Sequence, residues 1–127
     1  MSQSICFIGA GNMASSLIGG LLANGHEAAA ITACDINSEQ LARLQQRFGI
    51  NTSSDNLASA QTADVVMLAI KPQLMREVCN ALSSLPDNPE QLFVSVAAGV
   101  PADAIERWLG GDRAIVRCMP NTPALLQ

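Results

Sequence analysis

The sequence contains few aromatic and few basic residues. Aromatic side chains make up 3% of the 127 residues, tyrosine is missing, and only seven residues are lysine or arginine. The formal net charge is -4, and the basic residues are scattered between Arg43 and Arg117. A nucleic-acid-binding surface needs clustered positive charge. We therefore expect no nucleic-acid partner.

Charged residues are missing from the N-terminal stretch before Glu27, a property shared with signal peptides and membrane spans. A signal peptide needs a positive n-region, and a membrane-spanning helix needs roughly 20 predominantly apolar residues. Ser, Gln, Asn and five glycines interrupt this stretch before His26. We therefore expect no membrane partner and a cytoplasmic location.

Paired cysteines are also missing. Cys6, Cys34, Cys79 and Cys118 are widely separated among apolar neighbours, and His26 is the single histidine. No zinc site, Ser-His-Asp or Cys-His arrangement or pair of carboxylates can be recognised from this spacing. We expect no metal site, four buried free thiols, and a loop position without catalytic function for His26.

Apolar residues, in contrast, are abundant: 49% of the chain is hydrophobic, enough for one domain with a substantial core. Apolar runs of the strand type alternate with segments of helical periodicity. Strands are expected at 5–8, 29–35, 63–70, 92–96 and 114–119, with a short strand and a short helix within 50–61. This alternation predicts an α/β fold of the Rossmann-like, doubly wound type, with a mainly parallel sheet and helices on both faces.

The helices between these strands have recognisable ends and apolar faces. Asn37 or Ser38 is expected to cap the second helix, and Asp55 or Ser54 the short one. The residues expected to face the core are Met13, Leu17, Ile18, Leu21, Leu22, Leu41, Leu44, Phe48, Leu74, Met75, Val78, Leu82, Ile105, Trp108 and Leu109.

A glycine turn follows the first strand. The spacing Gly9-x-Gly11-x-x-Ala14, between a strand and a helix and followed about 20 residues later by Asp35, is typical of dinucleotide-binding sites. Gly9 allows the tight turn, Gly11 lets the backbone approach a pyrophosphate, and Ala14 lets the helix pack closely. Asp35 is placed to accept hydrogen bonds from a ribose. In the alternative interpretation, the glycines merely turn the chain and Asp35 starts a turn.

Ligands of such sheets bind at the carboxyl ends of the strands, so the residues after the later strands are further candidates. Lys71, the single lysine, could hold an anionic group there or be an ordinary solvated side chain. The small residues 97–99 could admit a flat ring or simply end a strand. The segment 119–123 fixes the backbone with two prolines around an amide and a hydroxyl.

Four segments together resemble pyrroline-5-carboxylate reductase. They are FIGAGNMA at 7–14, AIKPQ at 69–73, VSVAAGV at 94–100 and RCMPNTPA at 117–124, and they occur in order across essentially the whole chain. The last segment, after an A-A-G strand end, is the most specific.

The resemblance implies reduction of 1-pyrroline-5-carboxylate to L-proline with NADPH or NADH, the last step of proline synthesis. Hydride would pass from the nicotinamide to the imine carbon, while water or a nearby polar group supplies the nitrogen proton. Lys71 and Asn121 would position the substrate or stabilise charge. The implied cofactor contacts are Ile8, Gly9, Ala10, Gly11, Asn12, Met13, Ala14, Asp35, Asn56, Ala69, Ile70, Lys71, Pro72, Ala97, Ala98, Gly99 and Pro120.

Two departures accompany this resemblance. The family continues into a helical C-terminal domain that forms homo-oligomers and completes the substrate pocket, so we expect residues 1–127 to be the dinucleotide-binding domain of a longer enzyme, with little activity alone. Asp35 favours the 2′-OH of NADH, whereas the family commonly uses NADPH. A non-catalytic dinucleotide-binding regulatory module and another NAD(P)-dependent reductase sharing this domain remain alternatives.

Overall fold

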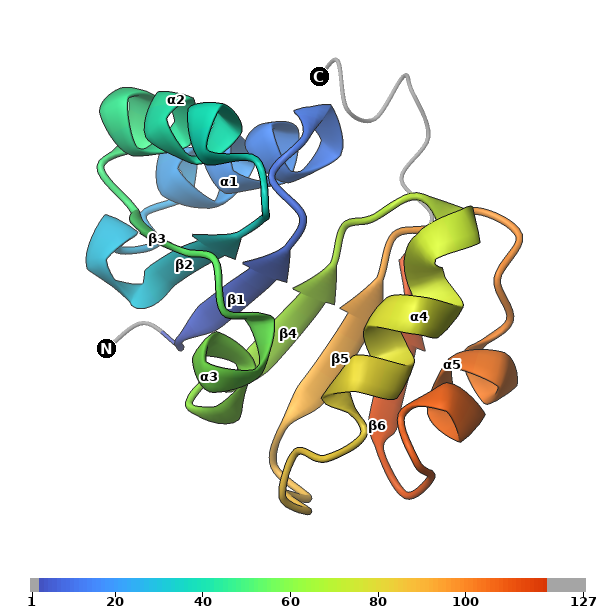
Figure 1. Cartoon of the computed structure of the whole chain (residues 1–127). Coiled ribbons are helices and arrows are strands. Elements are labelled where there is room, and N and C mark those ends of the chain that lie inside the picture. Colours follow the sequence, from blue (N-terminus) through green and yellow to red (C-terminus); the bar gives the residue numbers. More distant parts are fainter. Residues whose placement is uncertain (1–2, 119–127) are drawn as a thin grey trace.

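The computed structural model describes residues 3–118 and contains one parallel sheet within them, in the strand order β3-β2-β1-β4-β5-β6 (Figure 1). Its strands are β1 (Ile5–Ile8), β2 (Ile31–Cys34), β3 (Asn51–Ser53), β4 (Val65–Leu68), β5 (Leu92–Ser95) and β6 (Ala114–Arg117). Its helices are α1 (Asn12–Ala23), the 3-10 helix η1 (Ala28–Ala30), α2 (Ser38–Phe48), α3 (Asn56–Gln61), α4 (Pro72–Leu82) and α5 (Ala102–Trp108). The predicted Rossmann-like fold is confirmed.

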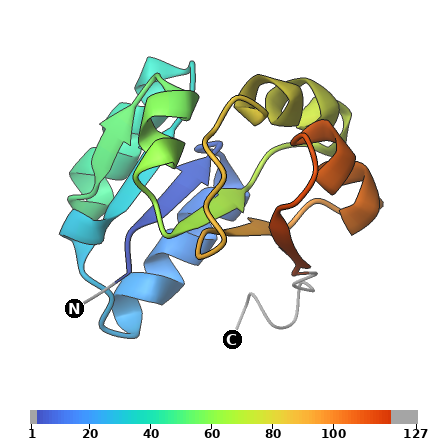
Figure 2. The same ribbon diagram turned by 90° about the horizontal axis from the view of Figure 1, so that it is seen from below.

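Alternation along the strands divides the core between the two faces of the sheet. Successive strand residues point to opposite faces, so Phe7 packs with Ile18 of α1 and Leu44 of α2, whereas Ile8 packs in the cluster that contains residues of α3, α4 and α5. All of β1 is buried because helices cover it on both sides. Figure 2 shows α1 on one side of the sheet and α3 and α4 on the other.

The helix ends follow the predicted capping chemistry. The Asn37 side chain accepts hydrogen bonds from the backbone N–H groups of Glu39 and Gln40, and the Asp55 side chain accepts one from Ala58. Helix α2 ends at Gly49, which has a φ of 71° in the left-handed region. Of the two alternatives expected at each helix, Asn37 and Asp55 are therefore the caps.

Some predicted boundaries were wrong. Residues 29–30 lie in η1 rather than in the second strand, because the run 28–30 consists of alanines, which have little strand propensity. The strand expected over 63–70 is limited to Val65–Leu68. The strand expected over 114–119 covers Ala114–Arg117, and residue 119 lies outside the described part of the chain.

Two helix faces also differ from the prediction. On α4 the buried residues are Met75, Cys79 and Leu82, whereas Leu74 is 44% exposed. On α1 the most buried residues are Ala14 and Ile18, while the expected row from Met13 through Leu17 and Leu21 is half-buried at the flank of the helix. Apolar side chains on neighbouring stripes made both helix rotations ambiguous in the sequence.

The cysteines are free thiols, but one of them is not buried. Cys6, Cys34 and Cys79 lie in the core as expected. Cys118 is exposed, which contradicts the prediction. It follows β6, the edge strand of the described sheet, and most of that strand is itself exposed.

Candidate functional site

The glycine turn lies at the point where the sheet reverses its winding direction, because β1 is flanked by β2 on one side and β4 on the other. Gly9 has a φ of 109° and donates its N–H to the Cys34 carbonyl at 2.8 Å. A Cβ atom at Gly9 would collide with the carbonyl group of Ala69. The turn therefore requires glycine for both its backbone conformation and its close contact with the chain after β4.

Backbone donors at the start of α1 point toward the carboxyl edge of the sheet. Gly11 is the N-terminal cap residue, and it has no side chain that could accept a hydrogen bond from the N–H groups of the first turn. Within residues 3–118, the N–H groups of Gly11, Asn12 and Met13 have no hydrogen-bond partner. Unpaired donors and the positive end of the helix dipole together favour a phosphate. A Cβ at Gly11 would meet no atom within 4 Å, so there is space in front of these donors.

Asp35 is close to the turn and is already hydrogen-bonded to the backbone. One carboxylate oxygen accepts the N–H of Ala10 at 2.9 Å, and the other accepts that of Asn37 at 3.0 Å. The carboxylate therefore joins the glycine turn to the start of α2. Each oxygen keeps further acceptor capacity, so these bonds are compatible with an additional contact to a ribose hydroxyl.

A first cavity, the strand-end pocket, has a volume of about 450 Å³ and lies beyond the ends of β1, β4 and β5. It contains many of the residues predicted to contact the cofactor. Its lining consists of Gly11, Asn12, Met13, Ala69, Ile70, Lys71, Pro72, Val96, Ala97 and Ala98. The segments 69–72 and 97–98 are far apart in the sequence and are brought together because their strands are neighbours.

The lining of the strand-end pocket combines small apolar groups with one cation. Ala69, Ala97 and Ala98 leave room for a flat ring, and Lys71 is exposed at the rim. Pro72 occupies the first turn of α4, where its missing N–H breaks no helical hydrogen bond. The pocket can therefore accommodate a planar apolar group beside an anionic one.

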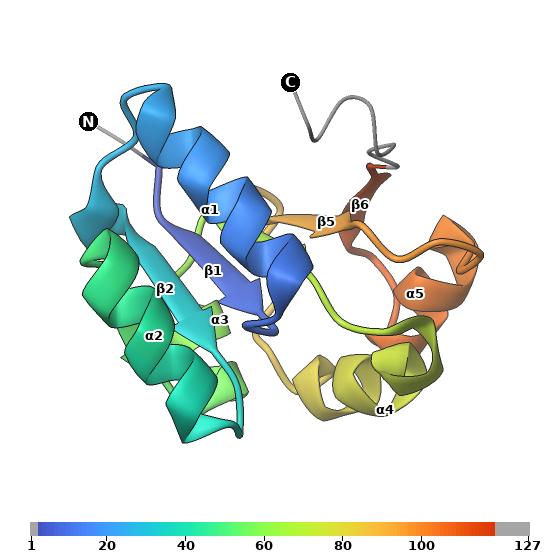
Figure 3. The same ribbon diagram turned by 90° about the horizontal axis from the view of Figure 1, so that it is seen from above.

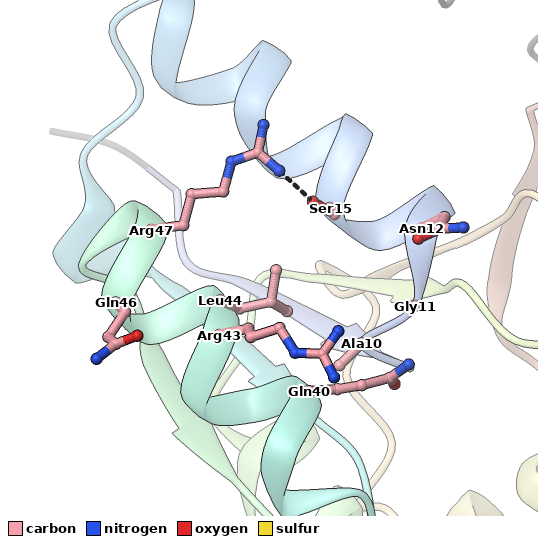
Figure 4. Close-up of a pocket in the computed structure, with 9 residues that line it drawn as sticks. All are labelled: Ala10, Gly11, Asn12, Ser15, Gln40, Arg43, Leu44, Gln46 and Arg47. Carbon is pink, nitrogen blue, oxygen red and sulfur yellow. Dashed lines mark hydrogen bonds between the residues drawn. The ribbon is translucent and has the colours of Figure 1, made fainter.

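A second cavity, the α1–α2 pocket, has a volume of about 440 Å³ and lies on the other side of Gly11 and Asn12. Figure 4 shows Gln40 and Arg43 extending from α2 toward Ala10. Arg47, one turn further along, donates to the Ser15 hydroxyl at 3.4 Å. The full lining is Ala10, Gly11, Asn12, Ser15, Gln40, Arg43, Leu44, Gln46 and Arg47.

Five polar lining residues of the α1–α2 pocket were not predicted: Ser15, Gln40, Arg43, Gln46 and Arg47. A signal for three of them exists in the sequence, since positions 40, 43 and 47 have the i, i+3, i+7 spacing of one helix face. Their approach to the glycine turn depends on α1 and α2 lying side by side, as Figure 3 shows. The adenosine half of a dinucleotide would lie on this side of the turn, near Asp35.

Among the described residues, the other predicted cofactor contacts lie outside both linings. Ile8 and Ala14 are buried beneath the turn, and Gly9 shapes it. Asn56 is the first residue of α3, directly after its cap Asp55. Gly99 is exposed with a φ of 77°. Pro120 and Asn121 lie outside the described residues.

Two thiols beneath the turn form a close pair. Cys6 Sγ and Cys34 Sγ are 3.7 Å apart, and both residues are buried. Their hydrogen bond, with burial, raises the pKa of Cys6 above its usual range, and the same hydrogen bond lowers the pKa of Cys34 to about 7. Since neither side chain is exposed, this pair is part of the core and is not a nucleophile facing the pockets.

Residues 3–118 contain neither a cluster of metal ligands nor a membrane-crossing helix. No group of three or more His, Cys, Asp or Glu side chains within them could hold a metal ion. None of the helices found there combines the length and apolarity that a membrane crossing requires.

Curated relatives with similar sequences are named pyrroline-5-carboxylate reductase. The protein from Pseudomonas aeruginosa is 54% identical over 97% of this chain, and that from Escherichia coli strain K12 is 42% identical over 99% of it. This chain covers 45% and 47% of those two relatives, so it spans about half their length. The predicted resemblance is confirmed by these matches.

Solved structures agree with the sequence relatives. A pyrroline-5-carboxylate reductase from Coxiella burnetii superposes with a TM-score of 0.92 and 39% identity, covering 99% of this chain and 47% of that one. The Plasmodium falciparum pyrroline carboxylate reductase with NADP bound has a TM-score of 0.80 and 26% identity, covering 98% and 44%.

The family match covers most of the domain described above. Residues 4–99 match the family described as NADP oxidoreductase coenzyme F420-dependent, a span that includes the glycine turn, Asp35 and the whole strand-end pocket. The chain therefore belongs to this family of NADP oxidoreductases.

Proposed function

We propose that the protein containing this chain reduces 1-pyrroline-5-carboxylate to L-proline with NAD(P)H, and that residues 1–127 are its dinucleotide-binding domain. The observation that carries this proposal is the pair of pockets on either side of the Gly11–Asn12 backbone. Unpaired N–H groups lie between a basic pocket and a pocket lined by small apolar side chains. This arrangement fits a pyrophosphate flanked by an adenosine and a nicotinamide.

Different residues of the chain bind different parts of the cofactor. The N–H groups of Gly11, Asn12 and Met13 bind the pyrophosphate. Asp35 stabilises the turn by accepting the N–H of Ala10. Ala97 and Ala98 give the nicotinamide ring a flat surface in the strand-end pocket. When bound, the reduced nicotinamide supplies the hydride. The protein then has to align the imine carbon with the ring and exclude water.

Lys71 has an electrostatic role in this proposal. It is exposed at the rim of the strand-end pocket, where an ammonium group can hold the substrate carboxylate or a cofactor phosphate. Asn121 and Pro120, beyond the described residues, are proposed to lie near the nicotinamide. We also propose that the half of the relatives not matched by this chain completes the substrate pocket and forms the homo-oligomer.

A chimaeric enzyme tests the proposed activity. Residues 1–127 would replace the matching 45% of the Pseudomonas aeruginosa relative, and proline formation would be measured together with oxidation of NADPH. We expect the chimaera to form proline and the isolated chain to form very little. A folded chimaera that binds NADPH without forming proline would refute the activity and support the non-catalytic dinucleotide-binding module instead.

A further inference from the structure

Two observations about the adenosine side of the site disagree on whether the chain selects NAD(H) or NADP(H). The carboxylate of Asp35 lies at the end of β2, where it favours a ribose 2′-OH and disfavours a 2′-phosphate. Yet the chain belongs to a family of NADP oxidoreductases, and a related reductase structure contains NADP. Another group near the turn must then stabilise a 2′-phosphate if the chain binds NADP(H).

The α1–α2 pocket supplies such groups. Arg43 extends into this pocket toward Ala10 (Figure 4). The N–H of Ala10 donates a hydrogen bond to the Asp35 carboxylate. Gln40 lies beside Arg43, and Arg47 lies at the far end with the Ser15 hydroxyl. Two guanidinium groups, an amide and a hydroxyl are all donors to phosphate oxygens. No acidic side chain is among the described residues that line this pocket.

Arg43 is available for such a contact. Within the described residues it forms one ion pair, with Glu39 of the same helix at 4.0 Å, and the two side chains are 75% and 86% exposed. An ion pair this exposed contributes little, so exchanging Glu39 for a phosphate has a small energetic cost. Asp35 is restrained by its two backbone hydrogen bonds to Ala10 and Asn37, which hold its carboxylate at the turn rather than in the pocket.

We propose that Arg43, assisted by Gln40 and Arg47, binds the 2′-phosphate of NADP(H) and determines which dinucleotide the chain accepts. This inference rests on the proposed dinucleotide-binding function and names the phosphate-binding side chains of that site. Phosphate monoesters carry close to two negative charges at neutral pH, and a guanidinium can bind two of their oxygens at once. NADH has no 2′-phosphate, so its affinity is independent of these side chains.

The test compares NADPH and NADH binding to the chain and to Arg43→Gln by fluorescence titration. We expect the substitution to weaken NADPH binding about tenfold or more and to leave NADH binding unchanged. Arg107→Gln is the matched control, because Arg107 is an exposed arginine on α5, at the other edge of the sheet. In competition assays, adenosine 2′,5′-bisphosphate should lose affinity for Arg43→Gln while adenosine 5′-phosphate does not.

The outcomes separate this inference from the function on which it rests. Equal loss of NADPH and NADH binding, or no loss of either, would overturn the role of Arg43 while dinucleotide binding stands. A wild-type chain that binds neither dinucleotide would overturn both. Arg47→Gln should give a smaller selective loss than Arg43→Gln, because Arg47 lies farther from Ala10 in the pocket.

Discussion

At the scale of single residues, Gly9 and Gly11 show how two glycines in one turn meet different constraints. Gly9 has a positive φ and no room for a Cβ beside Ala69. Gly11 has a φ of -83°, which any residue adopts, and open space around its Cβ position. The fold therefore requires glycine at position 9, whereas at position 11 the fold does not require it and the open space is available to a ligand.

Alanine should therefore reduce mainly the stability of the fold at position 9 and mainly the dinucleotide affinity at position 11. Gly9→Ala should destabilise the chain by about 2–4 kcal/mol, through strain and the clash with Ala69. Gly11→Ala should cost less than about 1 kcal/mol and yet abolish most dinucleotide binding, because its Cβ occupies the space of the pyrophosphate. Urea unfolding and NADPH titration measure the two effects. Normal NADPH affinity in Gly11→Ala would place the pyrophosphate elsewhere.

At the scale of elements, α4 connects the strand-end pocket to the core. Pro72 begins the helix at the pocket, and Met75, Cys79 and Leu82 anchor it on the sheet. The neighbouring Leu74 lies on the outer flank and is 44% exposed. The same helix thus carries a pocket residue at one end and buried residues along one face.

Adjacent substitutions on α4 test this orientation. Met75→Ala should destabilise the chain by about 2–5 kcal/mol, because Met75 is fully buried and a cavity would remain. Leu74→Ala should cost less than about 1 kcal/mol, since the side chain is already partly in water. Thermal or urea unfolding of both variants gives the comparison. Equal losses would mean that α4 is rotated relative to its described orientation.

Most of the fold could be predicted from local patterns. The buried strand 5–8 was predicted correctly, and Asn37 was one of the two caps predicted for α2, because neighbouring residues set both features. The rotation of α4 could not be predicted, because Leu74 and Met75 are adjacent apolar residues and only packing against the sheet separates them. Residues 29–30 were wrongly assigned to the strand that follows them, although alanine has little strand propensity.

Less of the candidate site than of the fold could be predicted, because the site depends on how the whole molecule is arranged. Segments 9–14, 69–72 and 97–98 could be found because each follows a strand of the parallel sheet, and strand ends meet at one edge. Arg43 and Arg47 follow no strand. Their position beside the glycine turn depends on how α1 and α2 pack together, which no local pattern specifies.

The stability of the whole chain should decrease in alkaline solution. Burial raises the pKa of the Cys79 thiol from 9.0 to about 11. The folded chain therefore keeps this proton at a pH where the unfolded chain releases it. This contribution to stability is fully present below pH 9 and is lost as the pH rises toward 11.

Urea unfolding across this pH range measures the loss. Cys79→Ala should flatten the decrease in unfolding free energy between pH 9 and 11, because it removes one group whose pKa differs between the two states. Cys118→Ala is the control at an exposed cysteine and should leave the slope unchanged. Identical slopes in the wild type and Cys79→Ala would show that Cys79 does not contribute.

NMR can show directly whether one dinucleotide spans both pockets across the glycine turn. NADPH would be titrated into the isotopically labelled chain while the backbone amide signals are followed. We predict saturable shifts that are largest at Gly11, Asn12 and Met13, with further shifts at Ala97–Ala98 and at Arg43. Shifts confined to residues away from these two pockets, or no saturable shifts, would show that the dinucleotide does not bind across the glycine turn.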